Sequence, residues 1–347
     1  MIVLRPHPQA KLLGAQTQDT QITVAQGMLQ QAIDVEFATL PPYLYSLYSI
    51  RPGSNAQAAQ LVKSVALQEM IHFCLASNIL NCIGGTPRVN PPKYPAPIGA
   101  PDDGALRLHL YPFSAAAMAQ AMAIEQPVDP PAYCPLPEGF PETDPLPDCL
   151  TIGQFYDLTK TVLRQLPASA FAVNRCQITD KQFFPGQLFA VNCVDDAIRA
   201  IDEIISEGEG SSTNPVDFQD DLAHYYRFGE VYYNAILTRT IHPAEQPYQW
   251  GEPLGVDYSL AGVYPAITDP ALFDFSTATP EAQLAQTACN KAFSTMVATL
   301  QNAVNGTQGA LGEAVQAMFL LRLSALNAFT VPLNSSGQVA GPAFQIV

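Results

Sequence analysis

Two long runs of helical periodicity, at residues 22–49 and 54–83, constrain the fold of this chain more than any other feature. In each run apolar residues recur at steps of three and four, the spacing of one face of an α-helix. The stripe of the first run consists of Leu29, Ile33, Leu40, Leu44 and Leu47. The stripe of the second run consists of Leu61, Val65, Ala76, Ile79 and Ile83. We therefore expect two long neighbouring helices at the centre of a mainly α-helical protein.

Local signals predict the ends and the course of these two helices. Pro41-Pro42 lies inside the first helix, and because a proline removes a backbone donor and clashes with the preceding turn, we expect a kink or a local break there. Ser54 and Gln57 have the spacing of a capping box and predict the start of the second helix. Gly84-Gly85 predicts its end.

Ionisable side chains interrupt both apolar stripes. Glu36 continues the stripe of the first helix, and Glu69 and His72 continue that of the second, so all three are expected to be buried. An ionised buried carboxylate without a partner costs several kcal/mol or more, and no Lys or Arg occurs between residues 12 and 50. Metal cations are the remaining partner, since Glu on one helix and Glu-x-x-His on its neighbour form half of a two-metal site in helical bundles.

A two-metal site needs a second half, and the rest of the chain offers candidates for it. Glu125 ends a helix that begins at Ser114, on the line of Met118 and Met122. His224 lies on an apolar face with Phe228, but the position three residues before it is Asp221, so Glu-x-x-His is absent there. The carboxylates upstream of His224 are Glu203, Glu207 and Glu209, of which Glu209 continues the stripe of Val194, Ile198, Ile201 and Ile205.

Each of these residues also has a structural interpretation. Glu36 could be a buried acid that accepts hydrogen bonds from tyrosine hydroxyls, and His72 a satisfied core histidine. Glu209 could be a solvated loop residue. Tyr43 lies two turns from Glu36 on a similar face, where it could donate a hydrogen bond to a metal ligand, carry an electron or simply pack.

Composition excludes several classes of partner. The chain has 347 residues with a net charge of -15 and no run of Lys or Arg, so it lacks the basic surface that nucleic acid or an anionic membrane requires. No stretch of about 18 apolar residues could span a bilayer, and the N-terminus lacks the apolar core of a signal peptide, so a cytoplasmic location is expected. The seven cysteines form no CxxC pair and are expected to be free thiols. Nucleotide-binding and serine hydrolase motifs are absent.

The remainder of the chain predicts further helices joined by long proline-rich connections. We expect a short strand near residues 106–110, a lid or pocket wall at 127–150, and a loop-like segment at 241–280. Helices are expected at 151–166, 194–205, 218–240, 281–303 and 310–329. The last two carry no candidate ligands, with Val297 and Leu300 facing inward on one. On the other the inward side chains are expected to be Val315, Phe319, Leu323 and Leu326, so this pair buttresses the bundle or forms a subunit contact, as in a homodimer. Domains of 1–240 and 241–347 follow.

Several motifs resemble the ferritin-like domain family related to the iminophenylpyruvate dimer synthase of violacein biosynthesis. They cover residues from about 22 to 230 and read EFATLPPYLYSLYSI (36–50), QEMIHFCLASNILNCIGGTP (68–87), AIEQP (123–127), TIGQFY (151–156) and SEGEG (206–210). The family usually has Glu where this chain has Gln154. The resemblance implies a ferritin-like helical bundle, with long proline-rich loops and extra C-terminal helices here. It implies the metal ligands Glu36, Glu69, His72, Glu125, Glu209 and His224.

These observations lead to a hypothesis of function, a non-haem di-iron oxidase or oxygenase. Two iron ions, or manganese or a mixed pair, would be bridged by Glu69 and a partner carboxylate such as Glu209, with His72 and His224 each binding one ion. Dioxygen and a small organic substrate, amino-acid-derived or from secondary metabolism, would be the reactants. The alternatives are a metal-binding or iron-storage protein, and a domain that has lost its metals and serves as a scaffold.

Overall fold

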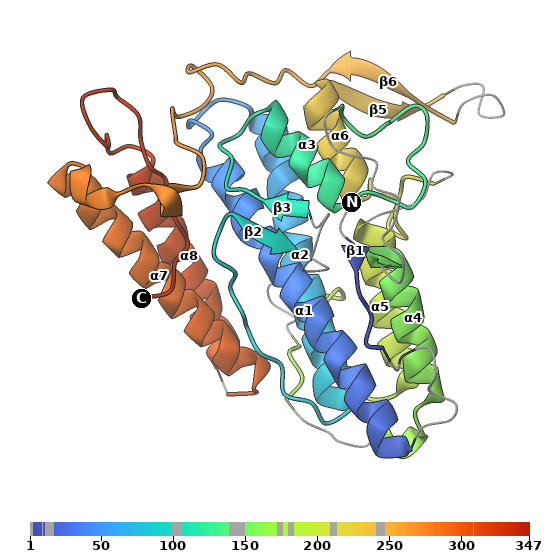
Figure 1. The fold of residues 1–347 in the computed structure, drawn as a ribbon. Helices are drawn as coiled ribbons and strands as arrows, with labels where there is room; N and C mark the ends of the chain where they lie inside the picture. The colour runs from blue at the N-terminus through green and yellow to red at the C-terminus, as the bar shows by residue number, and fades with distance from the viewer. Residues whose placement is uncertain are drawn as a thin grey trace.

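The two expected long helices form a hairpin at the centre of the molecule. In this computed structural model the described residues are 3–8, 10, 17–98, 106–138, 150–171, 176–179, 184–208, 214–240, 247–307 and 309–347. Helix α1 spans Gln18–Tyr48 and α2 spans Ala56–Cys82, and the two pack along most of their length. Their facing sides supply most of the central core (Figure 1).

Four shorter helices complete the bundle as two interrupted columns (Figure 1). Helix α3 (Ala115–Ile124) and α4 (Ile152–Gln165) both contact α1, whereas α5 (Val194–Gly208) and α6 (His224–Tyr233) both contact α2. In addition α3 packs against α6, and α4 against α5. The third and fourth columns of the bundle are therefore each broken into two helices, and the breaks lie beside the middle of α1 and α2.

Helix α1 runs without a break through Pro41 and Pro42, so the local break expected there is absent. A proline at position 42 has no N–H to offer the carbonyl of Ala38, four residues earlier. The hydroxyl of Tyr94 donates to that carbonyl instead, at 2.7 Å. A side chain from the segment after α2 thus replaces the missing helical hydrogen bond.

The capping box expected at Ser54 and Gln57 does not form. The N-cap of α2 is Asn55, which has a left-handed backbone (φ 50°) and makes no capping bond. Its side chain is paired with the backbone of Asp257, and the Ser54 hydroxyl donates to the carbonyls of Arg51 and Gly262. The end of α2 follows the sequence, because Gly84 adopts φ +77° directly after the C-cap.

The expected helix at 218–240 is much shorter than the sequence suggested. Helix α6 begins at His224 and ends at Asn234, which takes a left-handed conformation. The chain then forms strand β5 (Ala235–Arg239), antiparallel to β6 (Tyr248–Pro253) within the segment expected to be a loop. The Glu230 carboxylate accepts the backbone N–H of Leu237 and holds this turn.

Two smaller antiparallel pairs flank the bundle. Strand β1 (Val3–Leu4) pairs with β4 (Leu150–Thr151), and β2 (Ala96–Ile98) pairs with β3 (Leu106–Leu108), the strand expected near 106–110. Helix α4 starts at the N-cap Thr151, which forms a capping box with Gln154. Gln154, where the resembling family has Glu, therefore serves a structural purpose here.

The C-terminal helices α7 (Pro280–Val304) and α8 (Ala310–Ala328) pack against each other and contact α2 and α1 respectively. Leu300 is buried as expected, but the inward face of α8 was predicted wrongly. Phe319 and Leu323 are 61% and 64% exposed, while a stripe of smaller residues is buried. Small side chains let α7 and α8 approach closely, which outweighs the size of the apolar residues opposite. That buried stripe consists of Ala310, Ala314, Ala317, Leu321, Ala325 and Ala328.

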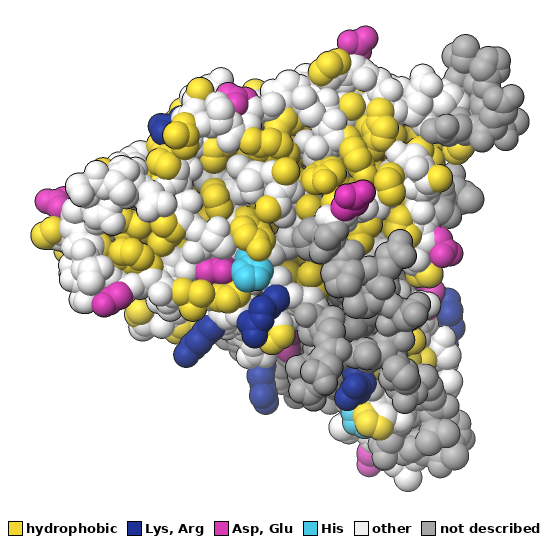
Figure 2. Space-filling model, turned by 45° about the horizontal axis from the view of Figure 1, so that its top comes forward, with side chains coloured by type: hydrophobic (Ala, Val, Ile, Leu, Met, Phe, Trp, Pro, Cys, Tyr) yellow, Lys and Arg dark blue, Asp and Glu magenta, His cyan; other side chains and the backbone are white. Residues whose placement is uncertain are grey.

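The remaining surface and the cysteines fit the composition. On the face in Figure 2, hydrophobic side chains are spread among few charged ones, in keeping with 14% charged residues overall. The cysteines in the described ranges are free thiols, and Cys149 lies outside those ranges. Among the helices described, none is long and apolar enough to cross a membrane.

Candidate metal centre

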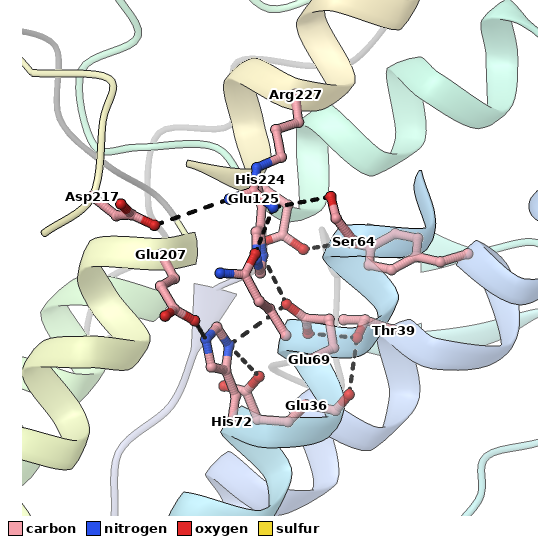
Figure 3. Close-up of polar contacts among 12 residues, drawn as sticks. Glu36, Thr39, Ser64, Glu69, His72, Glu125, Glu207, Asp217, His224 and Arg227 are labelled. Atoms are coloured by element: carbon pink, nitrogen blue, oxygen red, sulfur yellow. Dashed lines mark hydrogen bonds and ion pairs between the residues drawn. The ribbon is translucent and has the colours of Figure 1, made fainter. Parts of the chain in front are cut away.

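Buried carboxylates and imidazoles meet where the interrupted columns face the middle of α1 and α2 (Figure 3). The two continuous helices place their residues within regular turns, and the broken columns place theirs at helix ends. Glu125 is the C-cap of α3, Glu207 lies in the last turn of α5, and His224 is the first residue of α6. The complete set is Glu36, Glu69, His72, Glu125, Glu207 and His224.

The first half of the site is formed by α1 and α2. The Nδ1 atom of His72 lies 3.5 Å from Glu36 Oε2 and 3.7 Å from Glu69 Oε1. Glu69 and His72 are three residues apart, so one turn of α2 directs both toward the same point. The sequence stripe therefore places these three residues correctly.

The second half repeats this arrangement with residues of the broken columns. The Nδ1 atom of His224 lies 2.9 Å from Glu69 Oε1 and 3.5 Å from Glu125 Oε2. The two imidazole rings are stacked, with centroids 5.4 Å apart and an angle of 22° between them. One oxygen of Glu69 is thus shared by two triads, each with its own histidine and its own terminal glutamate.

Hydroxyl groups occupy the outer oxygens of the carboxylates. Tyr156 donates to Glu36 Oε1, and Tyr43 donates to Glu125 Oε1. The Thr39 hydroxyl lies 2.8 Å from Glu69 Oε2 and donates to it. The sequence singled out Tyr43 but missed Tyr156, although TIGQFY was among the resembling motifs. Each terminal glutamate therefore keeps one oxygen pointed at a histidine and has the other fixed by a tyrosine.

The outer nitrogens of both histidines are also engaged. His72 Nε2 lies 2.9 Å from Glu207 Oε2, and His224 Nε2 lies 3.2 Å from Gln68 Oε1. Carboxylate and amide oxygens can only accept here, so both histidines donate from Nε2 and direct the Nδ1 lone pair inward. Gln68 was missed from sequence, and its position directly before Glu69 gave no signal of this contact.

The sequence left open which acidic residue before His224 enters the site. Glu207 does so by its bond to His72, whereas Glu203 is half-buried and lies 3.8 Å from Arg199 in an ion pair on its own helix. Glu209, the predicted ligand, lies outside the described residues. Its place in the site therefore stays a prediction.

The electrostatics of the site reflect crowded carboxylates with little opposing charge. Burial, together with the neighbouring Glu125 and Glu36, raises the pKa of Glu69 to about 7. Burial alone would lower the pKa of His72, but its hydrogen bonds to Glu207 and Glu36 outweigh that effect and raise it well above the ordinary value. Burial and the same carboxylates raise the pKa of Tyr43. Without a cation, this cluster would have to hold protons.

The donor atoms fit metal ions. Two ligands each about 2.1 Å from one ion are about 3 Å apart when they bind at right angles, close to the spacing within both triads. His224 Nδ1 is fully buried and makes no hydrogen bond, although Glu69 Oε1 is 2.9 Å away. An inward lone pair without a donor is what a cation would use. Imidazole and carboxylate are the ligands of paired iron or manganese in helical bundles.

A small cavity adjoins the site on the side of α4 and α5. Its volume is about 20 Å³, enough for a water-sized occupant and far too little for an organic molecule. Glu36, Glu69, His72 and Glu125 line it, but His224 does not. Opposite them its wall is formed by residues of the shorter helices, among them Ile152, Tyr156, Ile204 and Ile205. The described part of the expected lid, 127–138, does not line it.

Comparisons with known proteins agree with this architecture. The family model described as ferritin-like matches residues 29–233. Solved structures with this fold include a ferritin-like protein from Caulobacter vibrioides, which is 23% identical and has a TM-score of 0.61. That match covers 91% of this chain and 96% of that chain, so it extends beyond residue 240, and at this identity it shows the fold alone. The search of curated proteins gives no match. Because the family model spans more than half of the chain, including every candidate ligand, this protein belongs to the ferritin-like family.

Proposed function

We propose that this protein binds two metal ions, iron in the first instance, and uses them with dioxygen to oxidise a small organic molecule. The observation that carries the proposal is the pair of matching triads around Glu69. Each triad offers one imidazole nitrogen and one terminal carboxylate, and Glu69 belongs to both. The residues that would hold the ions are Glu36, Glu69, His72, Glu125 and His224, with Glu209 as a further proposed ligand.

Bound iron would supply electrons to dioxygen, which is the oxidant. The protein's own groups would set the conditions for that reaction. Tyr43 and Tyr156 keep the terminal carboxylates from rotating, because each fixes one carboxylate oxygen by a hydrogen bond. The cavity beside Glu36 and His72 has room for a diatomic molecule next to the ligands, and its aliphatic wall excludes bulk water.

An organic substrate must approach from outside this cavity, which is too small to hold it. The wall formed by Ile152 of α4 and Ile204 of α5 separates the ligands from the rest of the protein on that side. We propose that substrate enters where this wall meets the 139–149 segment, under the expected lid. An amino-acid-derived substrate of secondary metabolism is supported by the resemblance to the iminophenylpyruvate dimer synthase family and is part of the proposal.

The test begins with metal content. Purified protein, stripped with chelator and reloaded anaerobically with Fe²⁺, should saturate at about two ions per chain. Exposure to oxygen should then consume dioxygen in proportion to bound iron. Saturation far above two ions would favour storage, and no binding would favour a metal-free scaffold; either result would contradict the proposal.

A matched pair of variants locates the binding. Glu69→Gln removes the shared carboxylate and should abolish stoichiometric binding. Glu203→Gln changes a neighbouring half-buried glutamate outside the site and should leave binding intact. Equal loss in both variants would point to general damage to the fold and not to loss of a ligand.

A further inference from the structure

The two halves of the candidate metal centre are alike at the ligands and differ directly behind them. Both histidines direct Nδ1 inward and donate from Nε2. His72 donates to a carboxylate, Glu207, at 2.9 Å, whereas His224 donates to an amide oxygen, that of Gln68, at 3.2 Å. This is the one position at which the matched pattern of glutamate, histidine and tyrosine is broken.

The carboxylate behind His72 strengthens that imidazole as a ligand. An acceptor on the outer N–H pushes electron density toward the inward nitrogen, and a negatively charged acceptor does so more than a neutral one. Glu207 is 5% exposed, so little water screens its charge from His72. It also adds negative charge beside the triad of Glu36 and His72, which a cation there would feel.

The amide behind His224 is under the opposite influence. Arg227 Nη1 lies 2.6 Å from Gln68 Oε1 and donates to the same oxygen that His224 uses. Further contacts fix the guanidinium, namely Ser64 Oγ at 3.0 Å and the carbonyl of Leu222. Because Arg can only donate, it orients the Gln68 amide with its oxygen toward His224 and makes Nδ1 the free nitrogen.

Arg227 also brings positive charge to the second half. Its nearest acidic neighbour, Asp217, is 4.0 Å away at Oδ2, an ion-pair distance at the edge of contact (Figure 3). Gln68 therefore positions His224 for a metal without supplying the charge that Glu207 supplies to His72. Gln68 and Arg227 are positioning residues and not ligands.

We infer that the two metal positions are inequivalent, and that the position at Glu36 and His72 binds its ion first and more tightly because of Glu207. This rests on the proposed function, since it presumes that the triads bind metal. Loss of a partner behind a ligating histidine typically weakens metal binding by about 10–100-fold, so the difference between the positions should be roughly tenfold or more. A chain with limited metal would then hold a single ion beside His72.

The experiment is a titration of the metal-free full-length protein with Co²⁺, followed by visible absorbance and calorimetry. The wild type should show two steps that differ by about tenfold or more in affinity. A crystal grown with less than one equivalent of Co²⁺ should show anomalous scattering beside His72 and not beside His224. Two equal steps, or first occupancy beside His224, would overturn the inference.

Two isosteric exchanges reverse the chemistry in each half. Glu207→Gln should weaken the first step by about 10–100-fold and merge it with the second, and Gln68→Glu should tighten the second step. The reciprocal design keeps the test decisive if one variant fails to fold, as judged by its circular dichroism melt. An unchanged first step in folded Glu207→Gln would refute the role of Glu207. Failure of the wild type to bind any Co²⁺ or Fe²⁺ would instead refute the proposed function itself.

Discussion

The two halves of the bundle supply similar ligands by different structural means. Helices α1 and α2 are continuous, and their ligands lie in the middle of regular turns. In the α3–α6 half, Glu125, Glu207 and His224 lie at helix ends. Positions within a helix are fixed by neighbouring turns, whereas positions at helix ends depend also on the connecting segments. The first half should therefore form with or without metal, and the second half should depend on metal for its order.

The largest expected effect is the loss of both ions when the shared carboxylate is removed. In Glu69→Gln, an amide takes the place of the oxygen that lies near both Nδ1 atoms. Affinity at both positions should fall by about 100-fold or more, since an amide cannot provide the negative charge. Plasma emission analysis of metal per chain measures this. Retention of two ions would show that Glu69 does not join the halves.

Removal of either histidine should affect one half only. His72→Ala and His224→Ala should each leave about one ion per chain, because each imidazole belongs to one triad. Isothermal titration with Fe²⁺ under anaerobic conditions counts the sites. If one variant lost both ions and the other lost none, the view of two matched triads would be wrong.

Metal binding should stabilise the interrupted half more than the continuous half. A ligand at about 100 times its dissociation constant adds about 2.7 kcal/mol of stability, and local opening of the α5 end and the α6 start breaks the second triad. Hydrogen exchange should therefore slow more in residues 204–208 and 224–228 than in the middle of α1 upon metal addition. Uniform slowing in all helices would remove the distinction drawn between the halves.

The tyrosines offer a comparison at the next smaller scale. Tyr43→Phe and Tyr156→Phe each remove a donor from a buried carboxylate, one in each half. Each should cost about 1–3 kcal/mol in the metal-free protein, since the glutamate loses a hydrogen bond without gaining water. Urea unfolding measures the loss. A cost near zero for one of them would show that its carboxylate is already satisfied elsewhere.

Two glycines should respond in opposite directions, with the smallest effects. Gly27 in α1 has open space around the position of a Cβ, so Gly27→Ala should stabilise by about 0.5–1 kcal/mol through helix propensity. In α6 the Cβ of Gly229→Ala would meet Cys134 Sγ at 3.0 Å and Trp250 at 3.4 Å. Overpacking should cost about 1–3 kcal/mol there. Thermal unfolding compares the two, and equal shifts would contradict the packing described for α6.

How much of this could be predicted from sequence follows the same division. Glu36, Glu69 and His72 were predictable because an uninterrupted helical period shows which side chains share a face. His224 was chosen from a helix at 218–240 that proved to begin at His224 itself, so the residue was right and the reason only partly so. The partners behind the histidines were not predictable, because the contacts of Glu207 and Gln68 depend on how separate helices pack.

The wrong face predicted for α8 has a different physical cause. Large apolar side chains such as Phe319 and Leu323 mark a stripe, but the alanine stripe on the other side allows closer contact with α7. A sequence pattern records how apolar each face is and not how near the neighbouring helix can come. Continuous long helices with ligands inside were the favourable case for inference, and a helix with two apolar faces was the unfavourable one.

The hydrogen bond from Tyr94 to the carbonyl of Ala38 has a consequence for the spacing of the whole centre. Glu36 precedes the proline pair of α1, and Tyr43, which grips Glu125, follows it. An unbent rod between them works as a ruler that sets how far apart the two terminal carboxylates stand. By splinting the helix at its weakest point, a residue with no contact to either triad holds that gauge constant.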